Sequence, residues 1–216
     1  MIYGVRDILA YSKKSAAPVV IIAPQSPKNN QWVNVPWDTD SHVMPEKPAL
    51  LMKLTMDLME HIMVNQSIDK SRIYVTGLSM GGFGTWDIVQ RMPHFFAAAL
   101  PVCGGGDTNQ AEIIKNVPIW AFHGDKDSVV KIKRTRDMIA VIKEVGGKPR
   151  YTEYKGVGHD SWTQTYSDQN VLRWLSYAKE RRKKNISKKG VVMSFFVRLF
   201  YVCAYGKKGT KSRLIV

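Results

Sequence analysis

One short motif limits the fold of this chain more than any other feature of the sequence. Gly77, Ser79 and Gly81 form a Gly-x-Ser-x-Gly pattern after the apolar run 72–76 and before a segment with apolar residues at helical spacing. Flanking glycines let a serine occupy a strained turn, because larger side chains would collide there. The motif predicts a strand, a sharp turn and a helix, with the Ser79 hydroxyl exposed at the carboxyl end of the strand. A plain glycine turn without chemistry is the alternative.

Apolar runs of strand length alternate with longer segments of helical periodicity. The runs are 18–24, 72–76, 97–102, 118–122 and 150–154, and the helical segments lie near 48–66, 80–91, 131–145 and 168–184, with the end of another helix in the first 16 residues. Continuous apolar runs suit strands covered on both faces. We therefore predict a three-layer α/β fold, in which helices cover both faces of a mostly parallel sheet. Gly146 and Gly147 are expected to end the third helix.

The residues that a nucleophilic serine requires follow later in the chain. A serine hydroxyl needs a general base, and the base needs a carboxylate that orients it. Asp125 and Asp127 follow the run 118–122, and His159 follows the run 150–154. Because the carboxyl ends of parallel strands share one edge of the sheet, we expect one of these acids, His159 and Ser79 to meet there. His123 is expected to support the acid loop.

Five separate motifs extend this pattern. They are Ala-Pro-Gln-x-Pro at 23–27 with Trp32, Gly-Leu-Ser-Met-Gly-Gly-Phe-Gly-Thr-Trp at 77–86, Pro-Val-Cys-Gly-Gly-Gly at 101–106, His-Gly-Asp-x-Asp-x-Val-Val at 123–130 and Gly-Val-Gly-His at 156–159. In this order they resemble the bacterial phospholipase/carboxylesterase-like α/β hydrolases, which include predicted peptidases and feruloyl-type esterases. The resemblance covers roughly residues 17–180.

The resemblance implies an enzyme and assigns its residues. It implies a serine carboxylesterase that forms an acyl-serine intermediate and needs no metal or organic cofactor. Ser79 would be the nucleophile, Asp127 the orienting acid and His159 the general base, while the backbone N–H of Met80 would stabilise the oxyanion. Asp125 would shape the loop instead. A feruloyl or acetyl ester, either a small molecule or linked to plant polysaccharide, is the expected substrate. Gln25, Trp32, Gly104 and Trp162 are its expected contacts, and Trp37 is another aromatic candidate.

The chain also departs from that family. Family members begin with a strand ending in His-Gly-x-Gly, which supplies a second oxyanion donor, and no such segment precedes Pro18. We therefore expect a hydrolase domain, residues 1–184, that lacks its N-terminal strands, including the one between the runs 18–24 and 72–76. Loss of one oxyanion donor costs about 10²–10³ in turnover. The alternatives to an active esterase are a catalytically impaired remnant and a serine peptidase of the same fold.

Charge and apolar patterning single out the end of the chain. The net charge is +14, and residues 179–216 hold twelve of the 32 lysines and arginines beside one acid, so the body is nearly neutral and no nucleic-acid partner is expected. We treat 185–216 as a basic, hydrophobic tail. Its apolar segment 191–205 has three interpretations: an adventitious extension, a helix packed on the domain, or a helix touching a membrane surface.

The two cysteines are expected to be free thiols. No signal-peptide pattern is present, and compartment and oligomeric state stay open.

Overall fold

The computed structural model describes residues 4–15, 19–66, 68–177, 192–195, 201–204 and 213–215. The helices are α1 (Val5–Lys14), α2 (Leu50–Asn65), α3 (Met80–Arg91), α4 (Ala111–Ile114), α5 (Lys133–Glu144), α6 (Trp162–Ser167) and α7 (Gln169–Tyr177), with a short 3-10 turn at Thr108–Gln110. The strands are β1 (Val19–Ile22), β2 (Ile73–Leu78), β3 (Ala98–Val102), β4 (Trp120–Gly124), β5 (Arg150–Tyr154), β6 (Val192–Phe195), β7 (Tyr201–Ala204) and β8 (Arg213–Ile215).

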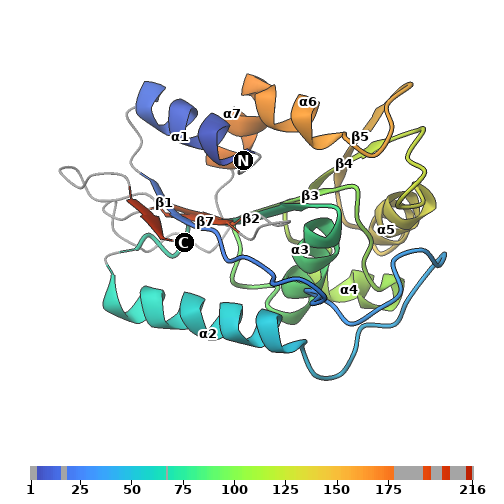
Figure 1. Ribbon diagram of the computed structural model, residues 1–216, viewed down its shortest axis with the longest axis horizontal. Coiled ribbons are helices and arrows are strands. Elements are labelled where there is room, and N and C mark those ends of the chain that lie inside the picture. The colour runs from blue at the N-terminus through green and yellow to red at the C-terminus, as the bar shows by residue number, and fades with distance from the viewer. Residues whose placement is uncertain are drawn as a thin grey trace.

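These elements form three layers around one sheet. Helices α1, α6 and α7 lie on one face, and α2, α3 and α4 lie on the other, with α5 packed against α4 (Figure 1). The strand order is β5-β4-β3-β2-β7-β6-β1-β8, and β2 to β5 run parallel to one another. The predicted α/β fold with helices on both faces is confirmed. The five predicted strands β1 to β5 and the helix in the first 16 residues are present as well.

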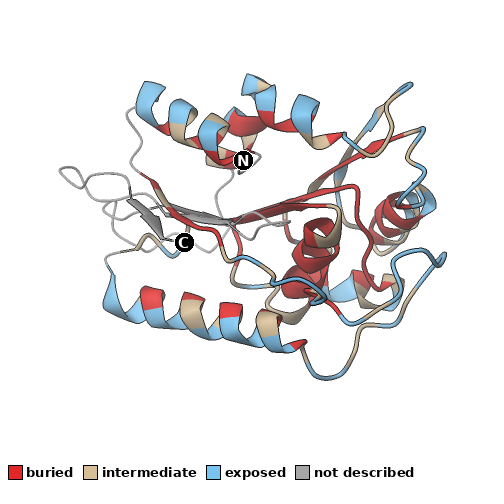
Figure 2. Ribbon diagram, viewed as in Figure 1, coloured by how far each residue is buried: buried red, intermediate tan, exposed pale blue. Residues whose placement is uncertain are grey.

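The core follows from the apolar runs of the sequence. Every residue of β2 and β3 is buried, because helices cover both faces of these central strands. Helices α1 and α2 bury the sides that face the sheet and expose the opposite sides, whereas α3 is buried nearly all round (Figure 2). Parallel strands end at one edge of the sheet, so the loops that follow β2, β4 and β5 come together there.

Near the end of the chain, the structure adds one helix that was not predicted and corrects one expectation. The helix expected near 168–184 is α7, and residues 178–184 lie outside the described residues; α6, which was not predicted, precedes it across the extended backbone of Asp168. In the apolar segment 191–205, the described residues form strands β6 and β7, so both helical interpretations are wrong for them. Such β-branched and aromatic runs suit strands. No helix in the described ranges is both long and apolar enough to span a membrane.

Strand β6 occupies a place that the sequence interpretation left without a strand. It runs parallel to both β1 and β2, and the backbone of Ser194 is in register with Ile21 on one side and Tyr74 on the other. Strand β7 pairs antiparallel with β2 and β6. The position between β1 and β2 is therefore taken by segments that come from the far end of the chain.

A close approach of two glycines fixes the start of α3 against the loop after β3. A Cβ on Gly104 would lie 2.4 Å from the carbonyl carbon of Gly82, and a Cβ on Gly82 would lie 2.3 Å from the carbonyl oxygen of Val102. These contacts are shorter than any side chain tolerates. The helix that follows Ser79 is thus held directly against the backbone of its neighbouring strand.

We expect Gly104→Ala to lower the free energy of unfolding by about 1–3 kcal/mol, the usual cost of overpacking a closed site. Urea denaturation followed by circular dichroism measures the change. Gly158→Ala is the matched control, because its added Cβ meets nothing nearer than 3.9 Å. Equal stability of the two variants would show that the approach of Gly82 and Gly104 is not as tight as described.

Candidate active site

Ser79 lies in a strained turn between β2 and α3. Its φ is 54° and its ψ is −121°, a conformation that residues with a side chain rarely adopt. Strain of this kind costs about 1–3 kcal/mol and persists only where the surroundings enforce it. Here the Ser79 N–H donates to the carbonyl of Val102 at 3.0 Å. A Cβ on Gly77 would lie 2.3 Å from the carbonyl oxygen of Gly81, so glycine is required sterically at position 77, as the motif predicts.

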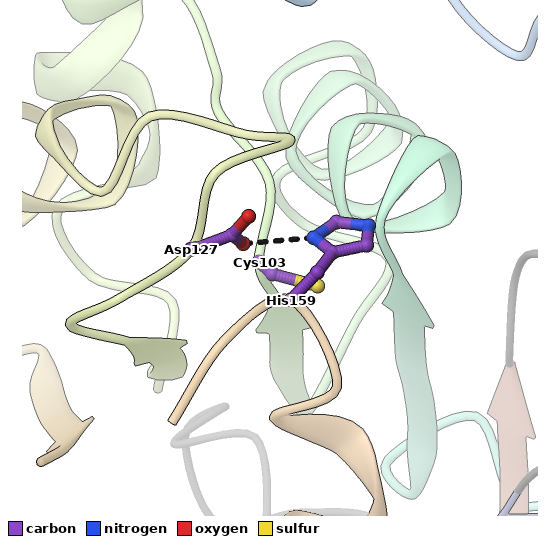
Figure 3. Close-up of side chains that lie close together, drawn as sticks. All are labelled: Cys103, Asp127 and His159. Carbon is purple, nitrogen blue, oxygen red and sulfur yellow. Dashed lines mark hydrogen bonds and ion pairs between the residues drawn. The ribbon is translucent and has the colours of Figure 1, made fainter. Parts of the chain in front are cut away.

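A hydrogen-bonded chain joins the three residues that the sequence places at this edge. His159 Nε2 lies 2.7 Å from Ser79 Oγ, and His159 Nδ1 lies 2.8 Å from Asp127 Oδ2. The contact between His159 and Asp127 is drawn in Figure 3. A carboxylate can only accept, so Nδ1 donates to Asp127, and Nε2 is then free to accept the Ser79 hydroxyl proton. This is the tautomer that a general base for a serine requires.

The acid loop holds Asp127 as an ionised carboxylate. Its side chain is fully buried, its Oδ1 accepts the backbone N–H groups of Val129 and Val130 at 2.9 Å each, and its Oδ2 lies 3.0 Å from His123 Nε2. Burial acts to raise the pKa of Asp127, but hydrogen bonds with His123, with His159 and with the two backbone groups outweigh it. The pKa of Asp127 is therefore held well below its usual range, and the group is charged at neutral pH.

Asp125 has a different contact. Its Oδ1 accepts the backbone N–H of Gly156 at 2.6 Å, which ties the acid loop to the loop that carries His159. Of the two acids that the residues alone left open, Asp127 is the one that contacts His159.

Met80 begins α3, so its backbone N–H has no acceptor within the helix. The N–H groups of Gly82 and Phe83 donate to the carbonyl of Ser79 at 2.7 and 3.2 Å. Met80 also lines the cavity beside Ser79. That its N–H stabilises charge developing next to Ser79 stays a prediction from the family resemblance.

An apolar cavity of about 430 Å³ opens at Ser79 and His159. Its lining contains no lysine, arginine, aspartate or glutamate; it consists of Gln31, Val33, Val35, Trp37, Leu78, Ser79, Met80, Phe83, Val129, Val130, His159 and Trp162. The ring of Trp162 meets the ring of His159 edge to face, with their centroids 5.2 Å apart. The cavity therefore offers aromatic and aliphatic walls to an uncharged ligand next to the Ser79 hydroxyl.

A comparison with known protein families shows which family this chain matches. The model of the dienelactone hydrolase family matches residues 38–198. The chain belongs to the dienelactone hydrolase family. This membership and the fold agree with the α/β-hydrolase resemblance seen in the sequence motifs.

Several characterised proteins are similar to this dienelactone hydrolase family member. A thermostable esterase of known structure is 38% identical with a TM-score of 0.66, over 73% of this chain and 43% of that one. Poly(3-hydroxyalkanoate) depolymerase C of Paucimonas lemoignei is 47% identical over 57 residues, 26% of this chain and 13% of that protein. The bifunctional acetylxylan esterase/xylanase XynS20E of Neocallimastix patriciarum is 26% identical over 112 residues, 49% of this chain and 17% of that protein. The chain thus spans less than half the length of these three relatives.

The fold recurs in a more distant protein. The structure of SOBER1 from Arabidopsis thaliana is 20% identical, with a TM-score of 0.54 over 67% of this chain and 72% of that one. At this identity the likeness concerns the fold alone.

Three of the four expected substrate contacts do not line the cavity. Trp32 is 1% exposed and packs in the core, so its ring cannot reach a ligand. Gln25 is exposed to solvent, and its amide donates to the carbonyl of Ala23. Gly104 is buried against Gly82. Trp162 does line the cavity, as expected.

The sequence interpretation missed seven cavity residues, of which Leu78, Val129 and Val130 lie within three residues of Ser79 or Asp127. Gln31, Val33 and Val35 lie on the irregular segment between β1 and α2, and Phe83 lies on the first turn of α3. Gln31, Val33 and Val35 belong to no run with helix or strand periodicity, so the sequence pattern did not indicate them. Phe83 had one available signal, because it lies four residues after Ser79 and therefore close to the nucleophile on the helix.

Three side chains at the site formed by Ser79, His159 and Asp127 have atoms of the kind that bind metals. Potential ligand atoms of Cys103, Asp127 and His159 all lie within 4.8 Å of one another (Figure 3). These atoms already take part in hydrogen bonds within the site. The Ser79 N–H donates to Cys103 Sγ at 3.3 Å, and His159 Nδ1 donates to Asp127. Burial raises the pKa of the Cys103 thiol far above its usual range, and a protonated thiol is a poor metal ligand. We therefore assign the cluster to the hydrogen-bond network.

The segment that forms one wall of the cavity is tied down by polar contacts. Arg134 Nη1 donates to the carbonyl of Thr39 at 2.9 Å, and Arg134 Nη2 contacts His42 Nδ1. Asp107 accepts the Met44 N–H at 2.9 Å. Burial, followed by the charge of Arg134, lowers the pKa of His42 to about 4. Neutral His42 can accept from Arg134, whereas protonated His42 would place a second cation there.

We therefore expect the free energy of unfolding to rise with pH between about 4 and 6.5. In this range the unfolded chain binds a proton at His42 that the folded chain does not, so stability is lost as the pH falls. Because His42 is only partly buried, solvent screening reduces the effect to about 1–2 kcal/mol. Urea denaturation at pH 5 and pH 7 measures it, and His42→Gln should flatten the difference. An unchanged difference in that variant would assign it to other groups.

Proposed function

We propose that this protein is a serine esterase that hydrolyses carboxylic esters through an acyl-serine intermediate. The observation that carries the proposal is the hydrogen-bonded chain from Ser79 Oγ through His159 to Asp127, at the base of an uncharged apolar cavity. The similarity to a thermostable esterase and to an acetylxylan esterase/xylanase supports ester substrates.

In the proposed reaction, Ser79 Oγ attacks the ester carbonyl carbon while its proton passes to His159 Nε2. Asp127 stabilises the imidazolium that results, and the N–H of Met80 donates to the oxyanion. His159 then gives the proton to the departing alcohol, which leaves an acyl group on Ser79. Water attacks this acyl group with His159 again acting as base, and the acid is released with Ser79 restored.

The cavity supports a choice among substrates. It has no charged side chain among its lining residues, and Trp37, Phe83 and Trp162 give it aromatic walls. A neutral ester with an aromatic or short aliphatic acyl group suits these walls, because burial of apolar surface favours binding. We propose feruloyl or acetyl esters, free or attached to plant polysaccharide, as the substrate class.

Hydrolysis of a panel of compounds tests the proposal. The panel consists of p-nitrophenyl acetate, p-nitrophenyl butyrate, methyl ferulate, acetylated xylan and a peptide p-nitroanilide. We expect cleavage of the esters and little cleavage of the anilide. Cleavage of the anilide alone would favour a peptidase, and cleavage of none by folded protein would favour an impaired hydrolase.

A further inference from the structure

A second histidine contacts the carboxylate of Asp127. His123 lies on β4 and is fully buried. Its Nε2 lies 3.0 Å from Asp127 Oδ2 and 3.0 Å from the carbonyl oxygen of Val130. Its Nδ1 lies 2.8 Å from Thr135 Oγ1. Every nitrogen of this buried ring therefore has a polar neighbour.

The neighbours of His123 determine where its proton lies. The Asp127 carboxylate and the Val130 carbonyl can only accept hydrogen bonds, so His123 Nε2 must carry a proton. Without that proton, a buried nitrogen lone pair would face two oxygens at 3.0 Å, which is strongly unfavourable. The other nitrogen faces the Thr135 hydroxyl, whose single proton can go either to His123 Nδ1 or to the carbonyl of Gly104.

We propose that His123 is a positioning residue that shares its Nε2 proton between Asp127 Oδ2 and the Val130 carbonyl, and so holds the carboxylate in line with His159. This proposal rests on the esterase function proposed above. Val130 also donates its own N–H to Asp127 Oδ1 at 2.9 Å. His123 thus supports both the carboxylate and the backbone that binds it.

The same ring connects the acid loop to the nucleophile turn. Thr135 Oγ1 also lies 2.8 Å from the carbonyl oxygen of Gly104. Gly104 in turn lies against Gly82, three residues after Ser79. His123 therefore fixes Asp127 relative to the backbone that positions Ser79.

The contact also affects the charge that His159 experiences. A donor on Asp127 Oδ2 draws negative charge away from the oxygen that accepts the His159 proton. Removal of the donor should let Asp127 stabilise a protonated His159 more strongly. Other ionisable groups near this pair are Cys103, beside Asp127 and His159, and Glu153, which is in register with His123 on β5 and is paired with Arg136. Asp125 lies on the acid loop, and Asp160 directly follows His159 and acts on Cys103.

The test compares His123→Asn with His123→Gln. The glutamine amide can reach the Nε2 position and donate to Asp127, whereas the asparagine amide reaches only the Nδ1 position. For His123→Asn we expect kcat on p-nitrophenyl acetate to fall by about 10- to 100-fold, the range for one hydrogen bond to a charged group. KM should stay unchanged because His123 does not line the cavity. The acid limb of kcat/KM should move to higher pH.

Two further variants show whether the effect comes from the hydrogen bond between residue 123 and Asp127. His123→Gln should restore most of kcat and the original pH profile. His61→Asn, at an exposed position on α2, should behave as the unaltered protein. A fall in kcat in both His123 variants with no shift of the acid limb would reduce His123 to a packing role and overturn the proposal, as would full activity of a folded His123→Asn variant.

A measurement on the unaltered protein needs neither a variant nor turnover. With ¹⁵N-labelled histidine, NMR should assign a protonated Nε2 to His123, with a proton protected from solvent exchange. An unprotonated Nε2 would overturn the proposal even if the protein is an active esterase. If esters are not cleaved but Nε2 is protonated as expected, the failure lies in the proposed function and not in the described contact.

Discussion

Replacement of Ser79 by alanine is expected to lower kcat for p-nitrophenyl acetate by a factor on the order of 10⁶, the loss that removal of a serine nucleophile causes in a serine hydrolase. The alanine cannot form the acyl intermediate, while His159, the cavity and the Met80 N–H remain. Substrate binding should change little, because the apolar walls of the cavity are intact. Stopped-time assays at high enzyme concentration measure the residual rate.

Ser167→Ala serves as the matched control for that experiment. Ser167 is exposed on α6, and its hydroxyl donates to the nearby carbonyl of Gln164. This variant should retain full activity. A Ser79→Ala variant that keeps more than a tenth of the activity would mean that hydrolysis does not proceed through this serine.

Replacement of Asp127 by asparagine is expected to lower kcat by about 10⁴-fold, as it does where an aspartate fixes the tautomer of a catalytic histidine. Asparagine presents an uncharged amide to His159 Nδ1 and cannot stabilise an imidazolium. Asp125→Asn should lower kcat by less than about 10-fold, because Asp125 contacts the Gly156 N–H and not His159. Kinetics of the two variants on the same ester give a direct comparison.

The two aspartate variants are well matched for comparison, because Asp125 and Asp127 lie two residues apart in one loop. Circular dichroism should show that both variants are folded under the assay conditions if the loss of activity in Asp127→Asn is chemical. An equal or larger loss of kcat in Asp125→Asn would contradict the assignment of the orienting acid.

The contacts that join Ser79, His159 and Asp127 could be predicted from the sequence, because each depends on a local rule. The glycines around Ser79 dictate a turn from strand to helix, and Asp127 and His159 follow strands whose carboxyl ends must share an edge. A spacing of 32 residues between Asp127 and His159 then becomes a contact of 2.8 Å. The support that His123 gives to the acid loop was expected from its position, but its proton could be placed only with all its neighbours known.

Apart from Trp37 and Trp162, the walls of the cavity could not be predicted, because long-range contacts set them. Val33, Val35 and Trp37 lie on a segment without regular structure, which Arg134 and Asp107 hold in place. Spacing alone does not give the direction of a side chain there. Trp32 therefore looked like a ligand contact, although it packs in the core.

Gly104 shows how the same residue type permits two opposite interpretations. A run of glycines suits an open turn beside a cleft, and it also suits a backbone that packs too closely for any side chain. The contact of Gly104 with Gly82 selects the second. The strands β6 and β7 were missed for a related reason, since their apolar residues suit a helix or a strand until the sheet supplies a neighbour.

Reaction of the purified protein with a fluorophosphonate, followed by peptide mass spectrometry, tests the central claim most directly. Fluorophosphonates phosphorylate a serine that a neighbouring histidine activates, so the measurement does not depend on knowing the natural ester. We expect one adduct, on Ser79, that forms more slowly in Asp127→Asn and is absent in Ser79→Ala. A folded protein that forms no adduct, or forms it on another serine, would contradict the assignment of Ser79, His159 and Asp127 as a catalytic unit.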